Sequence, residues 1–202
     1  MNAQDCLDML RKICDVSFAT VDEEGMPHNR IIDVMIVEEG RLYFCTARGK
    51  DFYRELVTNP AVAISGLNKD WQMVRLTGRT RRLDDQRAWI DRIFEENPSM
   101  NGVYPGAARY ILDPFVIEAG ELEFFDLGKE PIHRESFRFG DDAAPQARGF
   151  LITEDCIGCG TCTSCCPQQA IGEGTPFVIL QDSCLHCGLC FESCPAQAIV
   201  RR

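Results

Sequence analysis

Two stretches near the end of the chain repeat one cysteine spacing. Residues 156–167 read CIGCGTCTSCCP, and residues 184–195 read CLHCGLCFESCP. Both follow C-x2-C-x2-C-x3-C-P, and the second begins 28 residues after the first. Ala170-Ile171 recurs as Ala198-Ile199 at the same offset. The segment is therefore an internal repeat that carries two equivalent sets of cysteines.

This spacing resembles that of the bacterial ferredoxins, which bind [4Fe–4S] clusters. In that pattern three closely spaced thiolates face one cluster, and the fourth, which precedes proline, ligates the other cluster. The resemblance covers residues 150–202 and implies a small α+β ferredoxin-type domain with two [4Fe–4S] clusters. The implied ligands are Cys156, Cys159, Cys162 and Cys194 for cluster I, and Cys184, Cys187, Cys190 and Cys166 for cluster II.

Two zinc sites built from the same thiolates are the alternative, because CxxC pairs also bind zinc. Zinc requires neither the third C-x2-C step nor the duplication, so clusters are favoured. Cys165 adjoins a predicted ligand, and we expect it to be a small packed residue. His186 lies inside a cluster loop, where it is expected to modulate the surroundings of the cluster.

Composition restricts the class of protein. The chain has 202 residues, of which 45% are hydrophobic, and a formal net charge of -10. That charge disfavours nucleic acid as a partner, and no apolar run reaches the roughly 20 residues of a membrane span. The start, MNAQDCLDML, does not resemble a secretory signal. We expect a cytoplasmic protein whose acidic surface would dock with a basic patch on a redox partner.

The first 126 residues alternate short strand-like runs with turns. We expect helices over 3–13, 51–58 and 84–96, and strands over 16–21, 27–37, 41–46, 61–67 and 71–82, with a last strand pair over 110–118 and 121–126. Several short antiparallel strands with few helices predict a small, mainly-β barrel.

One stretch of this part has the composition of an anion site. Residues 41–58 comprise the strand RLYFCT, the turn ARGK and a helix, so a threonine hydroxyl and two cations precede a helix N-terminus. Taken singly, Lys50 is equally consistent with a solvated helix start. Arg30 and Arg75 are likewise consistent with surface salt bridges, and Trp71 with barrel packing.

Together, four motifs resemble the pyridoxamine 5'-phosphate oxidase-like family over about residues 8–126. They are RIID at 30–33, FCT at 44–46 followed by Lys50, NPA at 59–61 and QMVRLTG at 72–78. The resemblance implies a split β-barrel, normally a homodimer with FMN at the subunit interface, in which Thr46 and Lys50 hold the phosphate. The implied cofactor-binding residues are Arg30, Ile31, Ile32, Asp33, Thr46, Ala47, Arg48, Lys50, Trp71, Gln72 and Arg75.

The chain also departs from the oxidase pattern. Met35 stands where the oxidase has a substrate-contacting lysine, and the loop between Thr46 and Lys50 is shorter. The substrate-binding C-terminal segment of the oxidase is replaced by a linker and the ferredoxin-type domain. We therefore expect a flavin site but not pyridoxamine phosphate as the substrate.

The predicted domains are residues 1–126 and 150–202, joined by residues 127–149. This linker is polar, but Phe137 and Phe139 alternate with charged residues, so we expect it to dock as an extended strand. His133 is expected to be a surface residue.

A flavin exchanges one or two electrons, whereas each cluster exchanges one. The leading hypothesis is an oxidoreductase in which two [4Fe–4S] clusters relay electrons to or from an FMN that reacts with a small substrate or with NAD(P)H. One alternative is an electron-transfer adapter without a substrate, and another is a barrel that binds haem or a deazaflavin. No residue is assigned as a catalytic acid or base.

Overall fold

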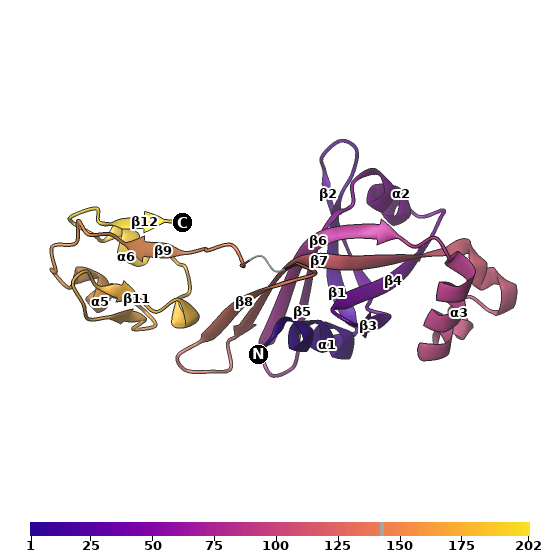
Figure 1. Ribbon diagram of the computed structural model, residues 1–202, viewed down its shortest axis with the longest axis horizontal. Coiled ribbons are helices and arrows are strands. Elements are labelled where there is room, and N and C mark those ends of the chain that lie inside the picture. The colour runs from indigo at the N-terminus through magenta and orange to yellow at the C-terminus, as the bar shows by residue number, and fades with distance from the viewer. Residues whose placement is uncertain (142–143) are drawn as a thin grey trace. The chain divides into compact units, whose positions relative to one another are not determined.

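The computed structural model describes residues 1–141 and 144–202, and the chain forms two compact units (Figure 1). The first comprises Met1–Lys69, Met73–Phe124 and Ser136–Ala144, and the second comprises Asp70–Gln72, Phe125–Glu135 and Pro145–Arg202. The predicted linker, residues 127–149, is thus divided between the units. Its residues 142–143 lie outside the described residues.

The first unit is built on a curled antiparallel sheet (Figure 1). The strand order is β2-β1-β5-β6-β7-β4-β3, and β8 pairs with β7 outside this path. A curled antiparallel sheet with few helices confirms the predicted mainly-β split barrel. The strands are β1 (Asp15–Val21), β2 (Pro27–Asp33), β3 (Ile36–Glu38), β4 (Arg41–Ala47), β5 (Ala61–Leu67), β6 (Gln72–Arg82), β7 (Leu112–Asp126) and β8 (His133–Phe139).

Four α-helices of the first unit accompany this sheet. α1 (Ala3–Ile13) begins with a capping box between Asn2 and Asp5, and it buries Cys6, Leu7 and Leu10 on one face. The other helices are α2 (Asp51–Thr58), α3 (Gln86–Glu96) and α4 (Met100–Val103), followed by the 3-10 helix η1 (Gly106–Ile111). None of the helices among the described residues is long and apolar enough to cross a membrane.

β4 lies between two hydrophobic clusters, so both of its faces are covered. Phe44 packs inside the barrel, with its ring 4.9 Å from that of Phe18, whereas Tyr43 and Cys45 belong to the cluster that includes α3. Burial of each large apolar side chain contributes about 1.5–3 kcal/mol. The end of β4, which begins the predicted phosphate-binding segment, is therefore held on both sides.

The sheet differs from the sequence prediction in two places. The expected strand over 27–37 is interrupted after Asp33 and resumes at Ile36. The expected pair over 110–118 and 121–126 is one continuous strand, β7. Gly120 lies in the gap between those two expected strands, and it packs closely, since a Cβ there would lie 2.3 Å from the carbonyl oxygen of Thr77.

The second unit carries the internal repeat as two similar halves. A left-handed backbone recurs at the repeat offset in three pairs: Gly158 and His186, Gly160 and Gly188, and Gln169 and Gln197, with φ between 51° and 84°. This conformation is costly for residues other than glycine, so its recurrence indicates a common loop path. The elements are β9 (Phe150–Ile152), which pairs with β12 (Ile199–Arg201), β10 (Ile171–Gly172), which pairs with β11 (Val178–Ile179), and the short helices α5 (Thr161–Cys165), η2 (Gln181–Ser183) and α6 (Leu189–Glu192).

Replacing Gly120 with alanine is expected to destabilise the first unit, because the added Cβ would lie against the Thr77 backbone. Overpacking of this kind costs about 1–3 kcal/mol. Denaturant unfolding of the full chain, followed by tryptophan fluorescence, measures the change. Gly102→Ala is the control, since nothing lies within 4 Å of its added Cβ. Equal stability of the two variants would contradict the close-packing explanation.

Candidate cofactor sites

Two hollows in the second unit are each lined by four cysteines. Each hollow takes three cysteines from one half of the repeat and one from the other half. The structure thus brings together both sets that the sequence predicts as ligands, although their binding of iron remains a prediction. The first hollow is lined by Cys166, Cys184, Cys187 and Cys190, and the second by Cys156, Cys159, Cys162 and Cys194.

Backbone N–H groups point at several of these sulfurs. Ala170 donates to Cys166 Sγ at 3.3 Å, and Ala198 donates to Cys194 Sγ at 3.4 Å, which are equivalent positions of the repeat. His186 donates its backbone N–H to Cys184 Sγ at 3.4 Å. Such donors stabilise negative charge on sulfur, so the loops are prepared for thiolates.

The cysteine sulfurs of the hollows do not form a compact single-ion group among the described residues. Four ligands at about 2.3 Å from one zinc ion lie within about 4 Å of each other. Among the described residues, no three of the hollows' cysteines have sulfurs within 4.8 Å of one another, whereas Cys14, Asp15 and Asp33 in the first unit do form such a compact group. The wider spacing fits a multi-iron cluster better than a single ion.

Burial makes three of the thiols in the hollows, those of Cys162, Cys184 and Cys190, harder to ionise. Burial raises the pKa of Cys162, and it raises the pKa of Cys190 to about 11, with the neighbouring cysteines adding to both shifts. The exposed Cys159 has a lowered pKa because Thr161 hydrogen-bonds to it. Thiolate ligation would therefore be coupled to binding of the cationic iron.

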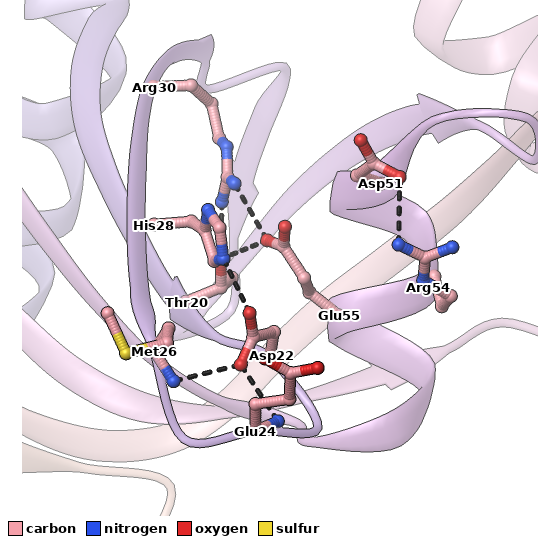
Figure 2. A network of polar contacts seen from close by, with 9 residues as sticks. All are labelled: Thr20, Asp22, Glu24, Met26, His28, Arg30, Asp51, Arg54 and Glu55. Carbon is pink, nitrogen blue, oxygen red and sulfur yellow. Dashed lines mark hydrogen bonds and ion pairs between the residues drawn. The ribbon is translucent and has the colours of Figure 1, made fainter.

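In the barrel, Arg30 on β2 belongs to a buried charge network (Figure 2). Its Nη2 donates to Glu55 Oε2 at 2.7 Å, and its Nη1 donates to the hydroxyl of Thr20, which also donates to Glu55. The guanidinium carbon lies 4.6 Å from the centre of the Phe52 ring. Glu55 is only 4% exposed. The network holds Arg30 against α2, so its ion pair is largely buried and differs from the surface salt bridge that was the alternative.

The other residues of the RIID motif are not gathered on one face. In the register of β1 with β2, Arg30 lies opposite Phe18, and Ile32 packs on the barrel core. Ile31 is 63% exposed. Burial and the neighbouring Asp15 raise the pKa of Asp33. Strand alternation thus divides a motif that was expected to line one cofactor.

The segment from Thr46 to Lys50 has the features expected of an anion site. The Thr46 hydroxyl is buried and has no hydrogen-bond partner. Lys50 is the exposed N-cap of α2, and no side chain caps that helix start. Orphan donors and a nearby cation suit a phosphate, so these residues fit the anionic end of FMN. Ala47 is buried between them.

Arg48 is held by a second buried carboxylate. It donates to Asp113 Oδ1 at 2.8 Å, and Asp113 also accepts from Tyr53 at 3.0 Å and from Arg82 at 3.4 Å. Two arginines thus share one carboxylate beside the start of α2. Burial raises the pKa of Cys45 to about 12, although Lys50 lowers it, so this thiol is not a nucleophile at neutral pH.

The predicted residues around β6 fall in both units. Trp71 is 63% exposed with φ of 62°, and Gln72 donates to Asp126 Oδ2 at 3.0 Å, both within the second unit. Arg75, in the first unit, donates to Glu123. The exposure of Trp71 departs from the barrel-packing alternative.

The acids that hold the predicted cations, Glu55 and Asp113, were not among the residues predicted from the sequence. Glu55 lies on the same face of α2 as Phe52 and Leu56, all three of them buried. An acid at helical spacing from buried apolar residues signals a buried ion pair. Asp113 has no comparable helical pattern of apolar residues before it in the sequence, because it follows the turn-rich residues 97–111.

Comparisons with known proteins agree with a division of the chain into an N-terminal barrel and a C-terminal cysteine-rich part. Residues 5–101 match the family described as pyridoxamine 5'-phosphate oxidase, and residues 153–169 and 176–199 each match a family described as a 4Fe-4S binding domain. No curated protein matches the sequence.

Similar solved structures cover about two thirds of this chain. A NimC/NimA family protein from Clostridium acetobutylicum is 27% identical, with a TM-score of 0.57 over 68% of this chain and 92% of that chain. A haem binding protein from Mycobacterium smegmatis is 15% identical, with a TM-score of 0.53 over 69% of this chain and 59% of that chain. A protein related to general stress protein 26, also from Clostridium acetobutylicum, is 14% identical, with a TM-score of 0.52 over 67% of this chain and 95% of that chain.

The similarities to the haem binding protein and to the protein related to general stress protein 26 show only that the fold is shared. The cysteine hollows and the two 4Fe-4S family matches identify the cysteine-rich remainder of the chain as ferredoxin-type. The chain therefore combines a pyridoxamine 5'-phosphate oxidase-like split barrel at its N-terminus with 4Fe-4S ferredoxin-type domains at its C-terminus, a combination that indicates a redox protein.

Proposed function

We propose that this protein is an oxidoreductase that binds FMN in the barrel and two [4Fe–4S] clusters in the ferredoxin-type domain. The observation that carries the proposal is the pair of four-cysteine hollows in a chain that also has a flavoprotein-type barrel. FMN would exchange one or two electrons and each cluster one, so the combination suits conversion between single electrons and electron pairs.

In the barrel, the residues around the start of α2 would hold the FMN phosphate. The buried Thr46 hydroxyl and the Lys50 ammonium supply donors, and Asp113 orients the nearby Arg48 guanidinium. Glu55 fixes Arg30 beside the same helix. Because these arginines are already held by carboxylates, they would position the cofactor with little reorganisation.

In the second unit, eight cysteines would ligate the two clusters, and the backbone donors at Ala170, Ala198 and His186 would stabilise the sulfur charge. Cys159 and Cys187 are exposed. A cluster edge at the surface permits single-electron exchange with an outside redox partner or with the flavin.

We further propose that the barrel forms a homodimer with FMN at the interface. Ile31 and Val57, which are 63% and 58% exposed, provide apolar surface that a second copy would cover. The small substrate or NAD(P)H would react at the flavin. Thiolate-bound clusters suit the reducing cytoplasm.

An electron-transfer adapter without its own substrate is the second candidate. Ile157, which lies between two predicted ligands of cluster I, is 70% exposed. An apolar residue at a cluster edge suits docking with a redox protein. Turnover with a small-molecule acceptor and no added protein partner would favour the oxidoreductase, whereas reduction of the cofactors without turnover would favour the adapter.

Protein purified without oxygen is expected to contain about eight irons, matching sulfide and one FMN per chain. Metal and sulfide analysis, flavin extraction and a visible spectrum measure these quantities. Iron without flavin would favour the adapter, and a haem or deazaflavin spectrum would replace FMN as the barrel ligand. Zinc without sulfide would contradict electron transfer.

Replacing Cys166 with alanine is expected to remove cluster II, about half of the iron, because this residue lines the hollow of cluster II. Cys165→Ala is the matched control at the adjacent position. It should retain all of the iron, since Cys165 lines neither hollow. Equal iron loss in both variants would contradict the ligand assignment.

Replacing Lys50 with glutamine is expected to weaken FMN binding about tenfold, because one charge-assisted hydrogen bond to phosphate is lost. Titration of FMN into flavin-depleted protein, followed by flavin fluorescence, measures the dissociation constant. Lys12→Gln, an exposed change on α1, should leave it unchanged. Unaltered binding in Lys50→Gln would place the phosphate elsewhere.

A further inference from the structure

Arg82, the last residue of β6, is anchored at one end of its guanidinium group. Its Nη1 donates to the hydroxyl of Tyr53 at 3.0 Å and to Asp113 Oδ2 at 3.4 Å. Tyr53 lies in the first turn of α2, and its hydroxyl donates to the same oxygen of Asp113 at 3.0 Å. Asp113 is only 5% exposed, so a buried carboxylate fixes the orientation of the guanidinium.

The other edge of the Arg82 guanidinium is open. Its Nε and Nη2 have no hydrogen-bond partner among the described residues, and the side chain is 54% exposed. These two N–H groups point in parallel and form the fork with which arginine binds two oxygens of a carboxylate or of a phosphate. The anchored side chain therefore presents an unused fork at the surface of the barrel.

Other arginines of the first unit have the same fork filled by an acid. The adjacent Arg81 donates from Nε and Nη2 to the two oxygens of Glu118, each at 2.9 Å. Arg138 donates from the same two atoms to Asp141, at 3.1 and 2.7 Å. Acids are abundant in a chain with a formal net charge of -10. An arginine that is anchored at Nη1 and unfilled at its fork is thus suited to an external anion.

The open fork lies beside the segment proposed to hold the FMN phosphate. Asp113, which anchors Arg82, also accepts from Arg48 at 2.8 Å. Arg48 and the exposed Lys50 belong to the loop that precedes α2. Three cations surround one buried carboxylate there, whereas the chain as a whole is negative. A positive region of this kind concentrates anions.

We propose that Arg82 binds an oxyanion group, a phosphate or a carboxylate, of the small molecule that reacts at the flavin. FMN has a single phosphate group, and the Thr46 hydroxyl, the Lys50 ammonium and the uncapped start of α2 already supply its donors. The fork of Arg82 would hold a second anionic group next to the cofactor. The inference rests on the proposed function, because it names the charge of the substrate or of the nicotinamide donor.

The test is a calorimetric titration of the full-length, FMN-loaded protein with two probes, inorganic phosphate and acetate. Wild-type protein should bind at least one of them, and Arg82→Gln should weaken that binding about tenfold, because charge-assisted hydrogen bonds are lost. Arg82→Lys keeps the charge but lacks the fork, so it should restore only part of the affinity. Arg81→Gln is the matched control and should bind as tightly as wild type, since Glu118 fills the fork of Arg81.

Titrations with NADP+ and NAD+, which differ by one phosphate group, separate the two sources of the oxyanion. Tighter binding of NADP+ that is lost in Arg82→Gln assigns the oxyanion to the nicotinamide donor. Equal binding of the two nucleotides, together with probe binding that depends on Arg82, assigns it to the substrate.

No probe binding to wild-type protein, or equal affinity in wild type and Arg82→Gln, would overturn the inference. Weaker FMN binding in Arg82→Gln, as large as that expected for Lys50→Gln, would also overturn it, because the fork would then hold the phosphate of FMN. Wild-type protein that takes up no FMN would overturn the proposed function, whereas the probe titrations would still decide whether Arg82 binds an oxyanion.

Discussion

Each hollow of the second unit is lined by three cysteines from one half of the repeat and by one cysteine from the opposite half. The stability of that unit depends on this crossing of cysteines between the two halves. Its hydrophobic cluster has only seven buried residues, two of which, Cys162 and Cys190, line the hollows themselves. A segment this short buries too little apolar surface for strong stability. Metal ligation that crosses between the halves would therefore supply folding free energy as well as redox chemistry.

A different constraint governs the barrel, where cations expected at the cofactor are held by buried acids. Glu55 and Asp113 are 4% and 5% exposed, and a buried carboxylate is tolerated only when it is paired. Arg30 and Arg48 supply that pairing. Their positions are consequently fixed by the fold before any ligand arrives, while the exposed Lys50 keeps the freedom to follow an anion.

The sequence predicted those features that depend on local spacing. The two cysteine sets could be assigned because each ligand loop lies within twelve residues. The bounds of α1 and α2 were predicted correctly from apolar spacing and from the stop at Asn59-Pro60. Pairings between residues far apart in the sequence could not be predicted, since Arg30 and Glu55 meet only when α2 packs against β1 and β4. The continuity of β7 also escaped prediction, because Gly120 has the same identity in a turn and in a close backbone approach.

A duplicated fold makes its two halves alike, so a difference between two clusters must come from residues that break the repeat. At the repeat offset, Gly158 is replaced by His186 and Cys165 by Ser193. A relay with direction needs sites of unequal electron affinity. In the second unit such an inequality would come from the positions that break the repeat, while the loop path common to both halves is kept.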